Sequence, residues 1–151
     1  MSISALLSPQ RIFIDAEITS KKKLLEFIAR VVAEQTQTTT ESCLFNGLLE
    51  RERLGSTGLG RGFAVPHARM AGLDKTLGCF FRLRQAVNFE APDNMPVDLV
   101  FSIVIPQQGT DEHLMILSSL ASIFSRTEIC DAIRTAESAA EVNNIIRTAE
   151  A

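Results

Sequence analysis

The stretch VDLVFSIVI, residues 97–105, constrains the fold of this chain more than any other segment. It is nearly continuously apolar and rich in β-branched residues, without the strict alternation of a strand that keeps one face in water. Pro106 and the QQG that follows end it. We therefore expect a central strand that other elements cover on both faces.

Helical segments that precede, interrupt and follow the strands can supply that cover. Most of them combine apolar residues at helical spacing with a residue that can accept a hydrogen bond as N-cap. The expected helices are residues 20–35 with Ser20 as N-cap, a second capped by Thr40 through about residue 53, residues 111–126 capped by Thr110, a shorter one around 127–135, and a last one that opens with a capping box from Ser138 to Glu141. The sequence thus predicts an α/β fold. It is a single domain, residues 1–151, with three layers and a mixed sheet flanked by helices on both faces.

Two further strands and a glycine-rich loop complete the pattern. Residues 77–87 are expected to form a half-exposed strand, because Phe81 and Leu83 alternate with Arg82 and Arg84. Residues 62–65 are a short strand candidate. The stretch before them, GSTGLGRG at 55–62, has four glycines in eight positions and is expected to be a loop rich in accessible backbone.

Composition excludes several classes of partner and compartment. The net charge is −3 and the only basic run, Lys21–Lys23, is expected to be the solvated start of a helix, so nucleic acid is not the expected partner. No apolar stretch approaches the ~18 residues that cross a bilayer, and the start of the chain lacks the pattern of a signal peptide. Three irregularly spaced cysteines fit reduced thiols. We expect a cytoplasmic protein that is not membrane-embedded.

One of the two histidines follows a proline in GFAVPHAR, residues 62–69. Pro66 pushes Val65 into an extended conformation and holds the strand straight up to His67. The ring is then expected to be exposed at a strand end beside the glycine-rich loop, where α/β proteins usually keep their ligands. The alternative is a histidine that merely packs at a strand terminus.

The other histidine, His113, falls near the start of a predicted helix, in its third position if Thr110 is the N-cap. Leu117, Leu120 and Phe124 lie in line with it at helical spacing, so His113 is expected to face the sheet as the topmost member of a buried stripe. The helix dipole disfavours the imidazolium there, so a neutral ring is expected. A purely structural histidine remains the alternative.

Metal binding and two catalytic motifs find no support in the sequence. There is no HxxxH or CxxC pattern, no GxSxG elbow, and the glycine-rich loop lacks the lysine of a P-loop. A neutral histidine beside backbone donors and a second imidazole is instead suited to attack a phosphoryl group.

Such a site also needs an arginine to neutralise phosphoryl oxygens. Four arginines are candidates, and spacing does not choose between the first two, which flank the apolar stripe of the second helix. They are Arg51, Arg53, Arg61 and Arg69. Glu52 falls near the centre of that stripe, which suggests that the helix ends about there.

The segment LLERERLGSTGLGRGFAVPHAR, residues 48–69, resembles the phosphorylation-site signature of enzyme IIA proteins in the fructose/mannitol group of the bacterial phosphotransferase system. GSTG followed by GxGxAxPH is similar to the nitrogen-regulatory branch of that group. The resemblance continues in NMPVDLVFSIVIP (94–106), in EHLMILSSLASIF (112–124) and in the start of the chain from residue 6 to 29.

The resemblance implies the IIA fructose/mannitol-type fold and roles for three residues. His67 would accept the phosphoryl group, His113 would contact it, and Arg51 would be the arginine of the family's RE pair. We expect no cofactor and no metal. The implied donor is an HPr-like phosphocarrier protein, and the implied regulated partners are proteins such as potassium transporters or sensor kinases.

Two other functions stay open at this point. A sugar-transport IIA component would pass its phosphoryl group to a IIB protein. A non-catalytic interaction module would keep both histidines for structural reasons.

Overall fold

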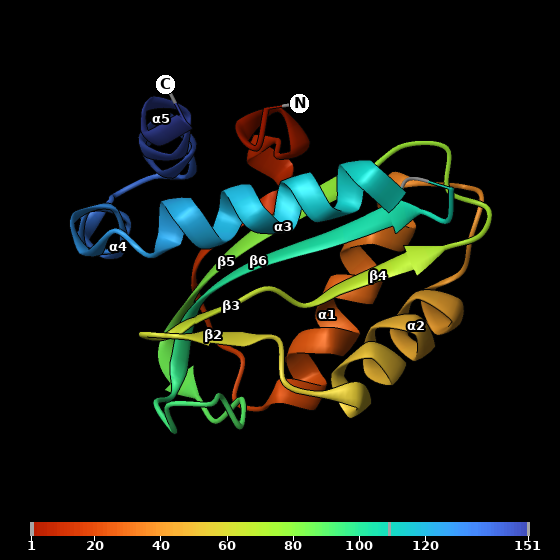
Figure 1. Ribbon diagram of the computed structural model, residues 1–151, viewed down its shortest axis with the longest axis horizontal. Coiled ribbons are helices and arrows are strands. Elements are labelled where there is room, and N and C mark those ends of the chain that lie inside the picture. The colour runs from red at the N-terminus through yellow and green to blue at the C-terminus, as the bar shows by residue number, and fades with distance from the viewer. Residues whose placement is uncertain (1, 109, 151) are drawn as a thin grey trace.

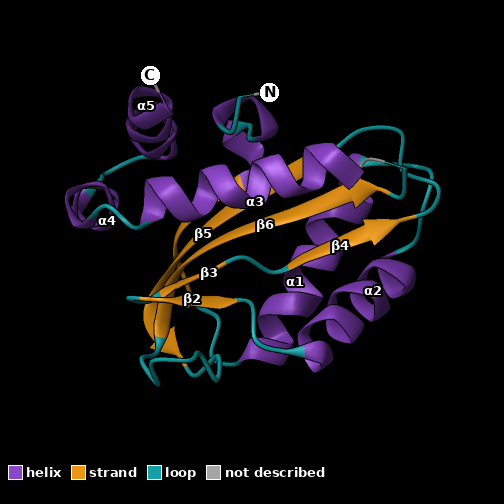
Figure 2. Ribbon diagram, in the orientation of Figure 1, coloured by secondary structure: helices purple, strands orange, loops and turns teal. Residues whose placement is uncertain are grey.

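A mixed sheet of six strands lies between two layers of helices in the computed structural model, which describes residues 2–108 and 110–150. Helices α1 (Lys21–Gln35) and α2 (Glu41–Leu54) cover one face, as Figures 1 and 2 show. The other face is covered by α3 (Thr110–Phe124), α4 (Thr127–Thr135), α5 (Ala139–Glu150) and the short 3-10 helix η1 (Ser4–Leu6). The predicted three-layer α/β fold is confirmed.

The central strand of the sheet is β6, as the apolar run predicts. The strands are β1 (Ile12–Ala16), β2 (Gly58–Gly60), β3 (Phe63–Ala64), β4 (His67–Met70), β5 (Leu77–Val87) and β6 (Val97–Pro106). β5 pairs with β6 antiparallel on one side, and β3 and β4 pair with it in parallel on the other, while β1 and β2 form the edges.

Both faces of β6 are buried, which explains why its sequence does not alternate. Val97, Val100 and Val104 belong to the core beneath α1 and α2. Leu99, Phe101, Ile103 and Ile105 belong to the core beneath α3, α4, α5 and η1. Burial of this kind is worth roughly 1.5–3 kcal/mol per large aliphatic side chain.

Most of the predicted helix starts are confirmed by their capping bonds. Ser20 accepts a hydrogen bond from the Lys23 amide, and Thr40 accepts one from the Cys43 amide. The capping box predicted at α5 is only half formed. Ser138 accepts a hydrogen bond from the Glu141 amide, but the Glu141 carboxylate accepts one from the Glu137 amide instead of the Ser138 amide. Helix α3 already begins at Thr110, so the predicted capping residue lies inside the helix and its side chain lies outside the described part of the chain.

Three strand segments were absent from the sequence-based prediction. β1 is a short edge strand without alternating burial, and its Asp15 has a positive φ of 55°. β2 lies inside the glycine-rich stretch predicted to be a loop, and it joins the edge of the sheet by pairing with β3. β4 begins at His67, where the strand was expected to end. Each is defined by its pairing partner, which a local pattern does not contain.

The longest helices, α1 and α3, have 15 residues each. At 1.5 Å per residue they span about 22 Å, short of the ~30 Å hydrocarbon core of a bilayer. No helix in the described part of the chain is long and apolar enough to cross a membrane.

Candidate phosphoryl-transfer site

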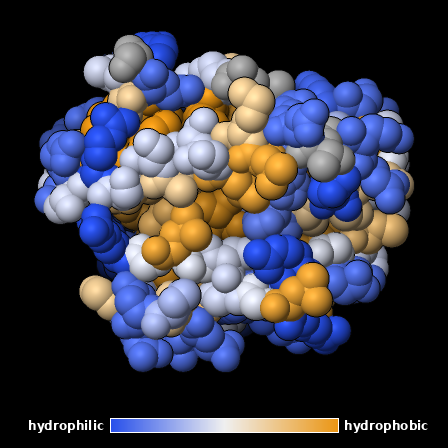
Figure 3. Space-filling model, in the orientation of Figure 1, coloured by the Kyte–Doolittle hydropathy of each residue, from blue (hydrophilic) through white to orange (hydrophobic). Residues whose placement is uncertain are grey.

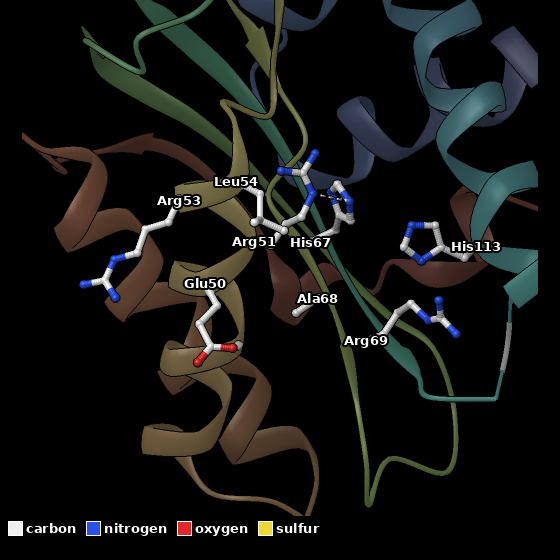
Figure 4. Close-up of a pocket in the computed structure, with 9 residues that line it drawn as sticks. Glu50, Arg51, Arg53, Leu54, His67, Ala68, Arg69 and His113 are labelled. Atoms are coloured by element: carbon white, nitrogen blue, oxygen red, sulfur yellow. Dashed lines mark hydrogen bonds between the residues drawn. The ribbon is translucent and has the colours of Figure 1, made fainter.

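His67 lies at the start of β4, just after a break in the chain's pairing along β6. Pro66 stands in the break, and its carbonyl accepts a hydrogen bond from the Ile103 amide at 3.0 Å. His67 itself pairs with Ile103. His67 is only 8% exposed, so the expectation of an exposed ring is wrong. The strand resumes instead of ending, and side chains from α2 and α3 reach the ring (Figure 4).

The two ring nitrogens of His67 have different partners, which fixes the tautomer. Nδ1 lies 2.7 Å from the carbonyl oxygen of Val65. A carbonyl oxygen accepts hydrogen bonds and does not donate them, so Nδ1 carries the proton. Nε2 therefore keeps a free electron pair, and Arg51 Nε donates to it over 3.3 Å. The unprotonated nitrogen is the one that faces the arginine.

The surroundings of His67 favour its neutral form. Burial of the ring is the largest cause that lowers its pKa below the usual 6.5, and the charge of Arg51 acts in the same direction. The hydrogen bond to the Val65 carbonyl and the charge of Glu52 oppose this without reversing it. At neutral pH the ring is thus an uncharged nucleophile.

Arg51 is the candidate arginine that contacts His67. It belongs to the last turn of α2, and its second hydrogen bond, from Nη1 to the Gly55 carbonyl at 2.8 Å, holds the guanidinium over the ring. Arg53 and Arg69 line the same cavity, but Arg53 points away from the histidines in Figure 4. Arg61 bonds to Ser125 elsewhere. Geometry therefore places Arg51 against His67 and sets Arg53 and Arg61 apart from it, while Arg69 also lines the cavity.

His113 reaches the site from the opposite side, as the fourth residue of α3. Its ring centroid lies 5.2 Å from that of His67, with the two planes at 78°. Its pKa is lowered by burial and by the neighbouring charges of His67, Arg69 and Arg51, so this ring is neutral too. Nδ1 of His113 is buried and has no hydrogen-bond partner among the described residues. The helical stripe thus brings the two histidines together, as expected.

An open cavity of about 620 Å³ lies over these side chains and is lined by both histidines and three arginines. Arginine donors and a neutral imidazole with a free electron pair suit an anionic, electrophilic group such as a phosphoryl. No cluster of three or more histidines, cysteines, aspartates and glutamates that could hold a metal occurs in the described ranges.

A buried acid behind the site was missed by the sequence reasoning. α2 does not end at Glu52 but continues to Leu54, and the Glu52 side chain is buried beneath the loop that follows. Its carboxylate accepts from Lys21 Nζ at 2.7 Å. Lys21 is therefore not a solvated helix start. A glutamate in the centre of an apolar stripe was the signal for such a pair, because a buried carboxylate needs a partner.

The site residues lie within a region that matches a known protein family. Residues 5–149 match the family described as "Phosphoenolpyruvate-dependent sugar phosphotransferase system, EIIA 2". The chain belongs to this enzyme IIA family. A nitrogen regulatory protein of Pseudomonas aeruginosa is 35% identical to it over 144 residues, which make up 95% of this chain and 94% of that protein. The resemblance seen in the sequence is thereby confirmed.

Solved structures of enzyme IIA proteins share the fold. The nitrogen regulatory protein IIA-Ntr from Neisseria meningitidis has a TM-score of 0.92 and 41% identity, with 95% of this chain and 98% of that chain covered. The mannitol IIA of Escherichia coli has a TM-score of 0.77 over 93% of this chain and 98% of that chain; at 23% identity this likeness shows the fold alone. Membership of the enzyme IIA family gives the chain a role in phosphoryl transfer.

Proposed function

We propose that this enzyme IIA protein is a regulatory phosphohistidine carrier. It accepts a phosphoryl group from an HPr-like phosphocarrier protein on Nε2 of His67. Its phosphorylation state then decides which cytoplasmic partners it binds, among them potassium transporters or sensor kinases. The chemistry rests on a single observation, the pair of hydrogen bonds on the His67 ring. Nδ1 donates to the Val65 carbonyl, and Nε2 faces Arg51 in the open cavity.

The transfer step follows from this geometry. The electron pair of Nε2 attacks the phosphorus atom, a new N–P bond forms, and the N–P bond to the donor histidine breaks with its electron pair returning to the donor ring. Arg51 gives up its bond to Nε2 and turns its donors to the phosphoryl oxygens. His113, on the opposite wall, can donate to another oxygen. The Val65 carbonyl stabilises the cation that develops on the ring.

The rim of the cavity supports docking of a protein donor. Leu54 lines it with 85% of its side chain exposed, and Leu114, next to His113, is 64% exposed. In Figure 3 apolar atoms gather along and below α3 and near the end of α2, and hydrophilic atoms lie mainly around the edges of this face. Exposed apolar side chains around a reactive ring fit a transient protein contact.

Phosphorylation would change this face electrostatically. A phosphoryl group adds roughly two negative charges and three acceptor oxygens. A partner surface that fits the neutral face would then be repelled. The relatives named as nitrogen regulatory proteins favour this regulatory role over sugar transport.

Intact-protein mass spectrometry tests the carrier function. The chain is incubated with phosphoenolpyruvate, enzyme I and the HPr-like carrier, beside the His67→Ala and His113→Gln variants. We expect an acid-labile gain of one phosphoryl group in the wild type and in His113→Gln, and none in His67→Ala. No gain in the wild type, with donors shown to be active, would leave only a binding module. Onward transfer to a sugar through a IIB protein would support the transport alternative instead.

A further inference from the structure

The loop between α2 and β2, residues 55–57, is anchored to a buried carboxylate that the phosphoryl chemistry above does not use. Both oxygens of Glu52 accept hydrogen bonds from Thr57: Oε2 from the backbone amide at 3.3 Å, and Oε1 from the hydroxyl. Lys21 Nζ lies 2.7 Å from Oε2 and completes the set. Glu52 and Thr57 are 7% and 3% exposed, so the carboxylate and its threonine partner are buried, while Lys21 is partly buried.

Thr57 in turn determines where Val65 lies. The Thr57 carbonyl accepts the Val65 amide at 3.0 Å. The Val65 carbonyl, at the other side of the same residue, accepts Nδ1–H of His67 at 2.7 Å. Pro66 follows with its restricted φ. Val65 is therefore held on its amide side by Thr57, and its carbonyl is aimed at the ring.

A second set of bonds holds the same loop from the other side. The Phe89 carbonyl accepts from both Lys21 Nζ at 3.2 Å and Ser56 Oγ at 2.8 Å. Lys21 Nζ also lies 4.8 Å from the centroid of the Phe89 ring. The lysine thus contacts both the acid and the segment that packs over the loop, which leaves Thr57 little freedom to shift.

From these contacts we infer that Glu52 and Thr57, with Lys21, are positioning residues for His67: they fix the Val65 carbonyl and thereby hold the ring in the Nδ1–H tautomer with Nε2 free. The inference rests on the proposed function, since Nε2 is the atom proposed to be phosphorylated. It adds that an ion pair whose two members do not line the cavity selects that atom. A merely stabilising ion pair would leave the tautomer unchanged.

The ¹⁵N shifts of the imidazole nitrogens test this in the unphosphorylated protein. The chain has two histidines, so few signals need assignment. The test variant Lys21→Met/Glu52→Ala removes the carboxylate without leaving an unpaired buried ammonium. The control Lys22→Met/Glu26→Ala makes the same changes at exposed positions of α1. We expect the Nδ1–H fraction of His67 to fall at least about twofold in the test variant and to stay unchanged in the control.

Thr57→Val provides a second, nearly isosteric test, and Thr57→Ser restores the hydroxyl. We expect Thr57→Val to lose part of the Nδ1–H tautomer and Thr57→Ser to recover it. In phosphoryl transfer, kcat should fall on the order of tenfold with KM for the carrier little changed, because misorientation affects the attacking atom and not docking.

The outcomes separate this inference from the proposed function. Folded Thr57→Val and Lys21→Met/Glu52→Ala proteins with the wild-type tautomer would overturn the positioning role, even if the wild type is readily phosphorylated. A wild type that takes no phosphoryl group would overturn the carrier function, while the tautomer measurement would still decide what Glu52 does. If only the double variant fails to fold, the comparison of Thr57→Val with Thr57→Ser decides.

Discussion

Arg51 Nε lies 3.3 Å from His67 Nε2, so the guanidinium occupies the electron pair that phosphoryl transfer would use. The same guanidinium also donates from Nη1 to the Gly55 carbonyl at 2.8 Å. In this resting arrangement the nucleophile is covered by the group best suited to bind the incoming phosphoryl oxygens. Accepting a phosphoryl group therefore requires Arg51 to exchange one acceptor for another.

Replacing Arg51 by glutamine should slow phosphorylation of His67 on the order of 100-fold, because a donor aimed at the transferring oxygens is lost. The pKa of His67 should rise, since the arginine charge lowers it. Arg51→Lys keeps the charge but lacks the planar guanidinium, so its phosphorylation rate should lie between those of the wild type and Arg51→Gln. Rapid-quench kinetics with the phosphorylated carrier measure the rates. Arg53→Gln is the matched control, and an equal loss there would mean that only net charge matters.

Acidification should reduce both phosphoryl acceptance and stability. The pKa values of His67 and His113 are lowered from 6.5, chiefly by burial. Between the folded pKa values and about 6.5 the unfolded chain binds more protons, so stability is full above that range and is lost as pH falls through it. Urea unfolding at about pH 7.5 and 5.5 should show a decrease that shrinks in a His67→Gln/His113→Gln variant. An NMR midpoint for His67 above 6.5 would contradict this sign.

Removing the second imidazole should slow transfer without moving the label. In His113→Gln we expect a rate loss on the order of 100-fold, comparable to the loss of one preorganised donor. His67 stays the labelled residue, which proteolysis and mass spectrometry of the phosphorylated chain determine. The free energy of unfolding should change little, because the ring is only partly buried and its Nδ1 makes no hydrogen bond in the described structure. Label found on His113 in the wild type would reverse the two roles.

The sequence predicted the layers of the fold and the meeting of the two histidines for a physical reason. β6 is apolar on both faces, so it had to be central, and β4 pairs with its C-terminal half from His67 onward. The chain then returns as α3 only a few residues after β6 ends, which brings His113 back over that end. Short connections make such neighbours predictable.

Contacts between side chains far apart in the sequence could not be predicted from local sequence patterns. The contact between Lys21 and Glu52 joins the first turn of α1 to the last turns of α2. The apolar stripe around Glu52 signals that this carboxylate needs a partner, but the local sequence does not indicate that the partner is Lys21. The burial of His67 also depends on side chains from two helices on opposite sides of the sheet. Choosing Arg51 among four arginines required either a resemblance or the structure itself.

Removing one member of the Lys21–Glu52 pair should destabilise the protein, because the other charge then loses its partner. The two side chains are 18% and 3% exposed, so each depends on the other for its charge partner. Glu52→Ala should lower the free energy of unfolding by about 3 kcal/mol, because the mostly buried ammonium loses its counter-charge and keeps only its contacts with Phe89. Lys21→Met should also be costly, since it leaves the carboxylate with the Thr57 donors alone.

The double variant Lys21→Met/Glu52→Gln should lose much less stability than the sum of the losses in Lys21→Met and Glu52→Gln. The methionine fills the space beside Phe89 without a charge, and the glutamine oxygen can still accept a bond from Thr57. A double-mutant cycle with Lys21→Met, Glu52→Gln and the double variant, measured by urea unfolding at pH 7.5, should give a coupling energy of at least about 1 kcal/mol. Additive losses would mean that water reaches the pair in solution and screens it, so that the carboxylate is not held as the buried geometry indicates.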